Sequence, residues 1–344
     1  MNEERMKILQ MIEKGTISAD EGAKLLDAVE EPSQKDPGQR EKSNYGLRNF
    51  LDDAMEKIKN ADFDLTFGEY IEFNDDTVLS KEEFHDADLS ISNGSLNVHT
   101  WDQEDVKASY RVKVYQVKTD EEARTRFHDE TQMEIKNGLL RIASPSKKIK
   151  MNVDLYIPNK KYEFIKSQLT NGNLDLDSIK SDHFQMKTSN GAVKAKQLTG
   201  KTCKIQTGNG AIQMLEGTFE ESETDTINGA ITLSGDIGKV DASTVSSGIT
   251  VDYSGSKAHT GFFKTTAGKI HVSLPTERKV DGVLKTKFGQ IQCELENYKI
   301  LKDRKDVANK MLEFEAYEQF EDAYHIEAET KTGSVTIQPP VQLK

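Results

Sequence analysis

The stretch Ser189-Asn190-Gly191-Ala192-Val193-Lys194-Ala195 decides the fold, because the chain repeats it at a fixed spacing. Four close copies carry glycines that lie 19 residues apart, and looser copies occur on both sides of them. The structural repeat glycines are Gly94, Gly138, Gly172, Gly191, Gly210, Gly229, Gly248, Gly268, Gly289 and Gly333. A fixed period of about 20 residues is typical of repeat architectures.

Most copies continue as a short strand in which apolar and polar residues alternate. The residues two and four positions after the glycine are apolar, and the residue between them is polar, which is the period of a β-strand. The apolar pairs are Leu174/Leu176, Val193/Ala195, Ile212/Met214, Ile231/Leu233, Ile270/Val272, Ile291/Cys293 and Val335/Ile337. A 19-residue unit cannot bury such a face alone, so the units must stack on one another.

Two kinds of stacking are compatible with this pattern. Asn-Gly is a strong hairpin signal, and a meander of hairpins would place Thr188 opposite Val193. The residue before the glycine changes along the chain, however, and Phe288 tolerates a positive φ poorly. We therefore expect a mainly β fold, a β-solenoid resembling a single-stranded β-helix with coils of about 19–21 residues, and keep the hairpin meander as the alternative. Leucine-rich and calcium-binding nonapeptide repeats lack their signatures here.

The first 60 residues predict helices rather than strands. Residues 1–31 form a two-helix module for self-association or partner binding, residues 32–45 a flexible linker rich in polar residues and proline, and residues 46–60 an amphipathic capping helix. The apolar faces proposed for partner binding consist of Met6, Leu9, Ile12, Leu25, Leu26, Val29, Phe50, Leu51, Met55 and Ile58.

The repeat domain is expected to span residues 61–340. Its first strand is predicted at 62–74, and the copies are irregular over 61–160, where residues 119–131 read as a long loop or a short helix. Regular repeats occupy 161–298. An insertion at 299–324 carries one predicted strand around Leu312 and Phe314, and the last coil runs over 325–340.

Composition and charge exclude several classes of protein. The net charge of -12 disfavours nucleic-acid binding and unassisted docking on anionic lipid. Cys203 and Cys293 both occupy apolar repeat positions, which indicates small core residues in a reducing compartment. The charged N-terminus does not resemble a signal peptide, and no apolar run is long enough to span a bilayer. We expect a cytoplasmic protein, with the cell surface, reached without a signal peptide, as the alternative.

The sequence offers no catalytic, metal or cofactor site. A glycosidase needs two carboxylates close together, and the outward row three residues after each glycine places no two carboxylates on neighbouring coils. This row consists of Asp175, Lys194, Gln213, Thr232, His271, Gln292 and Thr336. The histidines lack zinc spacing, and no phosphate-binding loop is present. The sequence therefore predicts a protein that is not an enzyme and needs no cofactor.

The repeats from about residue 62 to Pro339 resemble the bacterial "putative adhesin" domain of unknown function. The N-terminal helices resemble the short SHOCT-like module that precedes this domain in YvlB-like and LiaX-like proteins of Gram-positive bacteria. The resemblance implies a role in the cell-envelope stress response, near membrane proteins of the phage-shock type. It also implies, as an alternative, a cell-surface adhesin or antimicrobial-peptide sensor. No catalytic residues are implied.

Three hypotheses follow. The first is a non-enzymatic binding or scaffold protein, whose helical module associates with itself or with a partner protein while the solenoid presents an interaction surface. The second is the surface adhesin or peptide sensor. The third, a carbohydrate-active enzyme, would require a carboxylate cluster that the sequence does not display.

Overall fold

The computed structural model describes residues 69–80 and 82–339, which form 23 strands and one helix, α4 (Asp120–Glu130). The strands of the first half are β1 (Tyr70–Leu79), β2 (Asp86–Asn93), β3 (Leu96–Trp101), β4 (Val106–Tyr115), β5 (Gln132–Lys136), β6 (Leu139–Ser144), β7 (Ile149–Pro158), β8 (Lys161–Asn171), β9 (Leu174–Asp177), β10 (Lys180–Asn190) and β11 (Val193–Lys196). Those of the second half are β12 (Thr202–Asn209), β13 (Ile212–Asn228), β14 (Ile231–Ser243), β15 (Ile249–Tyr253), β16 (Thr260–Lys264), β17 (Ile270–Ser273), β18 (Lys279–Thr286), β19 (Ile291–Cys293), β20 (Lys299–Asp306), β21 (Asn309–Ala316), β22 (Ala323–Thr330) and β23 (Val335–Gln338).

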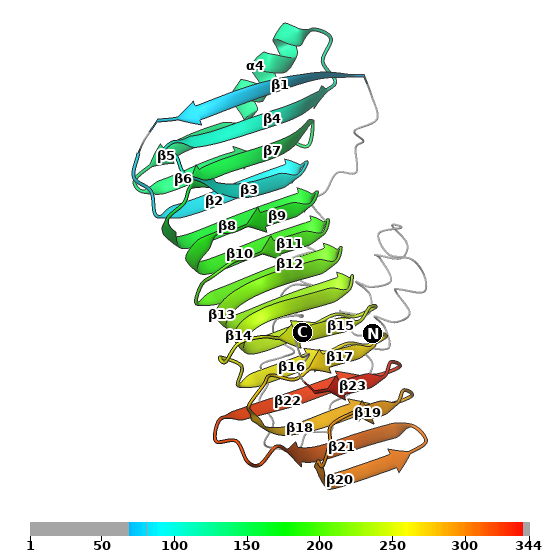
Figure 1. Cartoon of the computed structure of the whole chain (residues 1–344). Helices are drawn as coiled ribbons and strands as arrows, with labels where there is room; N and C mark the ends of the chain where they lie inside the picture. Colours follow the sequence, from blue (N-terminus) through cyan, green and yellow to red (C-terminus); the bar gives the residue numbers. More distant parts are fainter. Residues whose placement is uncertain (1–68, 81, 340–344) are drawn as a thin grey trace.

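The strands are arranged in two columns that run the length of the molecule (Figure 1). The first column follows the order β5, β6, β2, β8, β10, β12, β13, β14, β16, β22, β18, β21, β20. The second follows β1, β4, β7, β3, β9, β11, β13, β14, β15, β17, β23, β19. The long strands β13 and β14 belong to both. Apart from the fully exposed β20, alternate side chains of both columns point inward and form one continuous apolar core.

The regular coils pair in parallel, as the solenoid interpretation requires. Val193 aligns with Leu174 on one side and with Ile212 on the other, so the repeat of 19 residues is also the register of the stack. Thr188 pairs with Leu169 and Thr207 on neighbouring coils rather than with Val193. The hairpin meander is therefore wrong for these repeats, and the fold is mainly β and solenoid-like.

The repeat glycines lie where one coil passes directly over the next. A Cβ atom on Gly210 would lie 2.0 Å from the carbonyl oxygen of Gly191, and one on Gly229 would lie 1.8 Å from that of Gly210. Real Cβ atoms do not approach an oxygen so closely. Glycine therefore recurs at these positions because the backbones of two coils approach too closely to leave room for a side chain. Gly138 differs: it follows Asn137 in a two-residue turn between antiparallel β5 and β6, and both residues have positive φ. Its grouping with the stacked glycines was wrong.

Both ends of the stack are closed by antiparallel strands. At one end β1 pairs with β4, and α4 covers the core through Phe127, whose ring lies 5.6 Å from those of Phe73 and Tyr110. The helix begins after Thr119, whose side chain accepts a hydrogen bond from the backbone of Glu122. At the other end β21 pairs with β18 and β20. The insertion therefore contains two strands, and not the one predicted.

The order of coils in space differs from their order in the chain. The last coil, β22 and β23, lies between the β16–β17 coil and the β18–β19 coil (Figure 1). At the opposite end the coil of β2 and β3 lies between β6–β7 and β8–β9. The predicted helices within 1–31 and 46–60, the linker and the beginning of the predicted first strand lie outside the described residues.

Candidate functional site

Repeated polar side chains form ladders that hold the coils of the stack in register. One ladder consists of asparagines. The side-chain Nδ2 of each later member donates to the Oδ1 of the member before it at 2.8–2.9 Å, along the series Asn93, Asn171, Asn190, Asn209 and Asn228. Stacked amides of this kind stabilise parallel in-register strands. The ladder explains why asparagine so often precedes the glycine.

A second ladder is buried and consists of threonines. Thr188, Thr207 and Thr226 donate through Oγ1 to the carbonyl oxygens of Gly172, Gly191 and Gly210 at 2.8–3.0 Å. Thr244, Thr286 and Thr330 donate to glycine carbonyls further along the stack, and Thr265 donates to the carbonyl oxygen of Ser247. These residues were missed in the sequence, although all of them except Thr244 lie three residues before a repeat glycine, which was a visible signal.

The predicted outward row stacks in the second column. Asp175 aligns with Lys194, which aligns with Gln213, and the row continues through Thr232. Beyond the intervening Thr250 it follows His271, Thr336 and Gln292. The row presents a flat, mixed polar face. Cys203 is buried and Cys293 half-buried, both as free thiols, and burial raises the pKa of Cys293 to about 11.

Two aspartates on the first column are strongly affected by burial. Asp225 on β13 is only 5 % exposed and accepts a hydrogen bond from Ser243 Oγ at 2.5 Å. Burial raises the pKa of Asp225 to about 6, and burial together with the nearby charge of Asp225 raises the pKa of Asp241 to about 7. No group of three metal-binding side chains occurs within the described residues.

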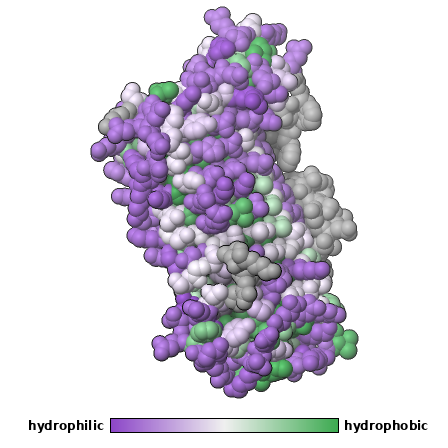
Figure 2. All heavy atoms as spheres, in the orientation of Figure 1, coloured by the Kyte–Doolittle hydropathy of each residue, from purple (hydrophilic) through white to green (hydrophobic). Residues whose placement is uncertain are grey.

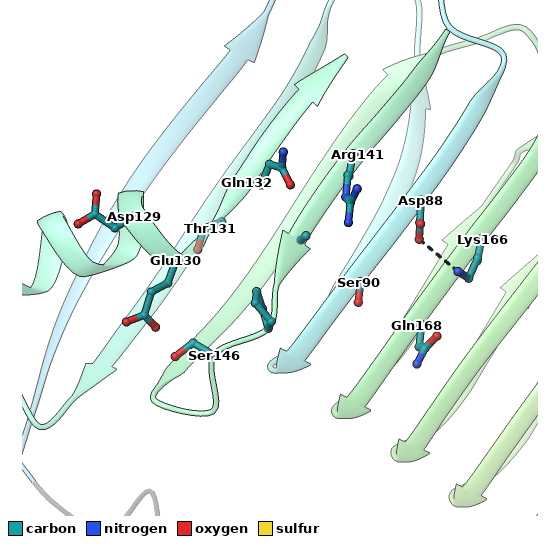
Figure 3. A pocket seen from close by; sticks show the side chains of 12 residues that line it. Asp88, Ser90, Asp129, Glu130, Thr131, Gln132, Arg141, Ser146, Lys166 and Gln168 are labelled. Carbon is teal, nitrogen blue, oxygen red and sulfur yellow. Dashed lines mark ion pairs between the residues drawn. The ribbon is translucent and has the colours of Figure 1, made fainter. Parts of the chain in front are cut away.

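A groove lies on the first column, beside the end of α4 (Figure 3). Its volume is about 790 Å³. Small side chains, Ala143 on β6 and Ser90 on the neighbouring β2, contribute to its lining. Larger polar groups complete it, and the lining residues are Asp88, Ser90, Asp129, Glu130, Thr131, Gln132, Arg141, Ala143, Pro145, Ser146, Lys166 and Gln168.

One cation of the groove has no partner among the residues that the structure describes. Lys166 Nζ lies 3.7 Å from Asp88 Oδ1, and Glu134, which faces Arg141 across β5 and β6, accepts a hydrogen bond from Gln132 at 2.7 Å. Both acids next to Arg141 thus have other partners. Within 69–80 and 82–339, Arg141 forms no hydrogen bond or ion pair, and in Figure 3 it extends among the other lining residues. The groove offers donors and acceptors for a polar ligand.

The predicted site residues lie in three kinds of place. Eight of the glycines stack close to the neighbouring backbone, Gly248 approaches Lys269 more loosely, and Gly138 lies in a hairpin turn. All residues of the predicted partner-binding helix faces lie outside the described part of the chain. None of the groove residues was singled out from the sequence. Among the described residues, no helix has the length and apolar character needed to cross a bilayer.

Comparison with known proteins identifies the family. Residues 84–338 match the family described as Toastrack DUF4097, and residues 3–34 match a SHOCT-like domain. YvlB of Bacillus subtilis, described as an uncharacterized protein, is 35% identical over 360 residues, covering 98% of this chain and 99% of YvlB.

Solved structures with similarity to the chain include two described as adhesion proteins. A "putative cell adhesion protein" from Clostridium sporogenes is 13% identical and covers 78% of this chain and 100% of its own, with a TM-score of 0.30. A "putative adhesin" from Bacteroides fragilis is 12% identical and covers 79% of this chain and 97% of its own, with a TM-score of 0.32. The resemblance read from the sequence is confirmed by the family match and by YvlB, and the chain belongs to the Toastrack DUF4097 family.

Proposed function

We propose that this protein is a non-enzymatic binding scaffold of the bacterial cell-envelope stress response. Its groove in the first column contacts a partner protein, and its N-terminal SHOCT-like module, residues 3–34, associates with itself or with that partner. The observation that carries the proposal is the groove itself, in which Arg141 has no partner within the described part of the chain and lies among hydroxyl, amide and carboxylate groups.

The groove is suited to binding because its walls are held in place. Ser90 and Gln168 lie on neighbouring strands of a continuous sheet, and Lys166 is held near Asp88. Polar groups fixed before binding lose little conformational freedom when a partner arrives, which favours affinity. Arg141 matches a carboxylate of the partner.

The partner that best fits the family is a membrane protein of the phage-shock type or a second copy of the chain. We also place the protein in the cytoplasm. Both cysteines, Cys203 and Cys293, are free thiols, and unpaired cysteines are usual in a reducing compartment. Protease added to intact cells should then leave the protein uncut, whereas digestion would assign it to the cell surface.

The groove is tested by cross-linking in cells. A photoreactive amino acid at Ser146, on the groove, should capture a defined partner, whereas the same probe at the exposed Lys180 should not. Arg141→Glu should abolish the cross-link, and Arg111→Glu, at an exposed arginine of β4, should preserve it. Equal cross-linking by all variants would contradict the proposal for the groove.

The N-terminal module is tested separately. Deletion of residues 1–31 should lower the mass measured by light scattering if the module self-associates, or remove the captured partner if it binds that protein. An unchanged mass together with unchanged capture would contradict a binding role for the module.

A further inference from the structure

Exposed apolar side chains gather at the β20 end of the stack. Six large hydrophobic residues are exposed within the described chain, and four of them lie here: Phe288 (68 %), Ile300 (51 %), Leu301 (47 %) and Val307 (95 %). The other two, Tyr70 and Val78, lie on β1 at the opposite end. Figure 2 shows hydrophobic atoms among hydrophilic ones at the lower end of the molecule, where Figure 1 places β20 and β21.

The two most exposed of these residues lie at one corner of that end. Phe288 follows β18, and Val307 connects β20 to β21. Thr286 at the end of β18 pairs with Lys310 at the beginning of β21, and Lys310 Nζ donates to the carbonyl oxygen of Gly289 at 2.7 Å. The turns that carry Phe288 and Val307 are therefore neighbours. We refer to Phe288 and residues 299–310 as the tip.

The tip is positively charged although the chain as a whole is acidic. Residues 299–310 contain five lysine or arginine and two aspartate residues, a net charge of +3 against -12 for the whole chain, and one of these cations, Lys299, is paired with Glu315 of β21 at 3.4 Å. Within 69–80 and 82–339, Lys302 and Arg304 have no ion-pair or hydrogen-bond partner, and both are exposed. The outermost strand of the stack thus combines exposed apolar groups with cations that are free to meet an anion.

The same strand is poorly suited to pairing with another strand. Its register with β21 shifts between Ile300 and Lys302, which places Leu301 in a bulge. Asp303 and Lys305 form an ion pair at 2.7 Å, and charged residues and bulges are common protections of an open sheet edge. Two tips brought together would also repel each other, because both carry positive charge. A second copy of this chain is therefore a poor occupant.

We propose that the tip docks end-on against the headgroups of an anionic lipid bilayer. Lysine and arginine beside exposed apolar side chains are the combination that binds a protein to such an interface without spanning it. The acidic body need not oppose docking. Electrostatic interactions are screened over about 8 Å at physiological ionic strength, and strands are spaced by about 4.8 Å, so coils beyond the second are largely screened.

Flotation of the full chain with vesicles tests this proposal. The protein should bind vesicles of phosphatidylcholine with phosphatidylglycerol, and should not bind phosphatidylcholine alone. Lys302→Gln with Arg304→Gln should weaken binding about 25-fold, because each cation near an anionic surface contributes about fivefold. Phe288→Ser with Val307→Ser should weaken it about tenfold or more per side chain.

Matched controls use the opposite end of the molecule. Lys136→Gln with Lys150→Gln removes two exposed cations there, and Tyr70→Ser with Val78→Ser removes its two exposed apolar groups. Both controls should bind like the unmodified protein. Equal binding to neutral vesicles, or equal losses in tip and control variants, would overturn the proposal.

A finding that the tip binds a second copy of the chain, and not lipid, would also overturn the proposal. In that case the tip variants would lower the mass of the protein in the absence of vesicles. The proposal goes beyond the scaffold function and does not depend on it. Groove cross-linking should survive the tip substitutions, so failure of one proposal is distinguishable from failure of the other.

Discussion

Replacing Thr207 with valine should weaken the stack, whereas the same replacement at Thr224 should strengthen it. Both threonines are fully buried on adjacent strands of the first column. Thr207 Oγ1 donates to the carbonyl oxygen of Gly191 at 2.8 Å, whereas the hydroxyl of Thr224 has no hydrogen-bond partner within the described residues. Valine has nearly the same shape as threonine, so the hydroxyl group is the main difference.

The expected magnitudes follow from what each hydroxyl does. Thr207→Val leaves the Gly191 carbonyl at a half-buried corner without its side-chain donor, and loss of such a partner costs about 1–3 kcal/mol in the free energy of unfolding. Thr224→Val removes a polar group that is buried without compensation, and should raise the free energy of unfolding by about 1 kcal/mol.

The comparison is made by urea unfolding. Circular dichroism and the fluorescence of Trp101, the one tryptophan of the chain, should give coincident transitions, and the m-value should stay constant. Thr207→Ser retains the hydroxyl and should recover part of the loss. If Thr224→Val destabilised the protein as much as Thr207→Val, hydrogen bonding at the glycine corner could not be the source of the effect.

Three further predictions concern other parts of the stack. Burial raises the pKa of Asp225 to about 6 from an ordinary value near 4, so between these values the folded state holds a proton that the unfolded chain releases. The free energy of unfolding should therefore fall as pH rises from about 4 to 6. Thermal unfolding at pH 7 should show that Asp225→Asn is more stable than the unmodified protein. Gly210→Ala, whose Cβ would lie 2.0 Å from an oxygen, should cost more in urea unfolding than Gly248→Ala, where the distance is 2.9 Å. Truncation after residue 322 should increase hydrogen exchange at backbone amides of β16 and β18. Unchanged protection of these amides would contradict their pairing with β22.

The repeat pattern was sufficient to predict a stack, because its signal is local. Apolar residues two and four positions after each glycine can be buried only against another coil, and Ile212 aligns with Val193 and Ile231 as the period requires. Asn137-Gly138 is equally local: it lies between alternating strands and forms the hairpin that the Asn-Gly signal ordinarily indicates. Treating it as one more repeat glycine obscured that signal.

The groove could not be predicted, because it depends on the order of coils in space. Ser90 and Gln168 are 78 residues apart in the chain, yet they lie on adjacent strands because the β2–β3 coil lies beside β8–β9. The apolar residues follow the same pattern in most coils, so this pattern does not determine which coil packs against which. Periodicity therefore shows that coils stack and leaves open which coils are neighbours, and every site made by non-consecutive coils stays hidden.

Interleaving also changes what is expected of a repeat protein. Coils that contact only their neighbours in sequence can fray one at a time from either end. Here β22 must separate from both β16 and β18 before the last coil leaves, and Tyr324 within it is fully buried, with its hydroxyl 3.1 Å from that of Tyr253. The β18–β21 end, which carries the tip, is therefore joined to the middle of the stack through the last segment of the chain. The end that meets a lipid surface in our proposal should unfold together with the coils that β22 bridges, and not before them.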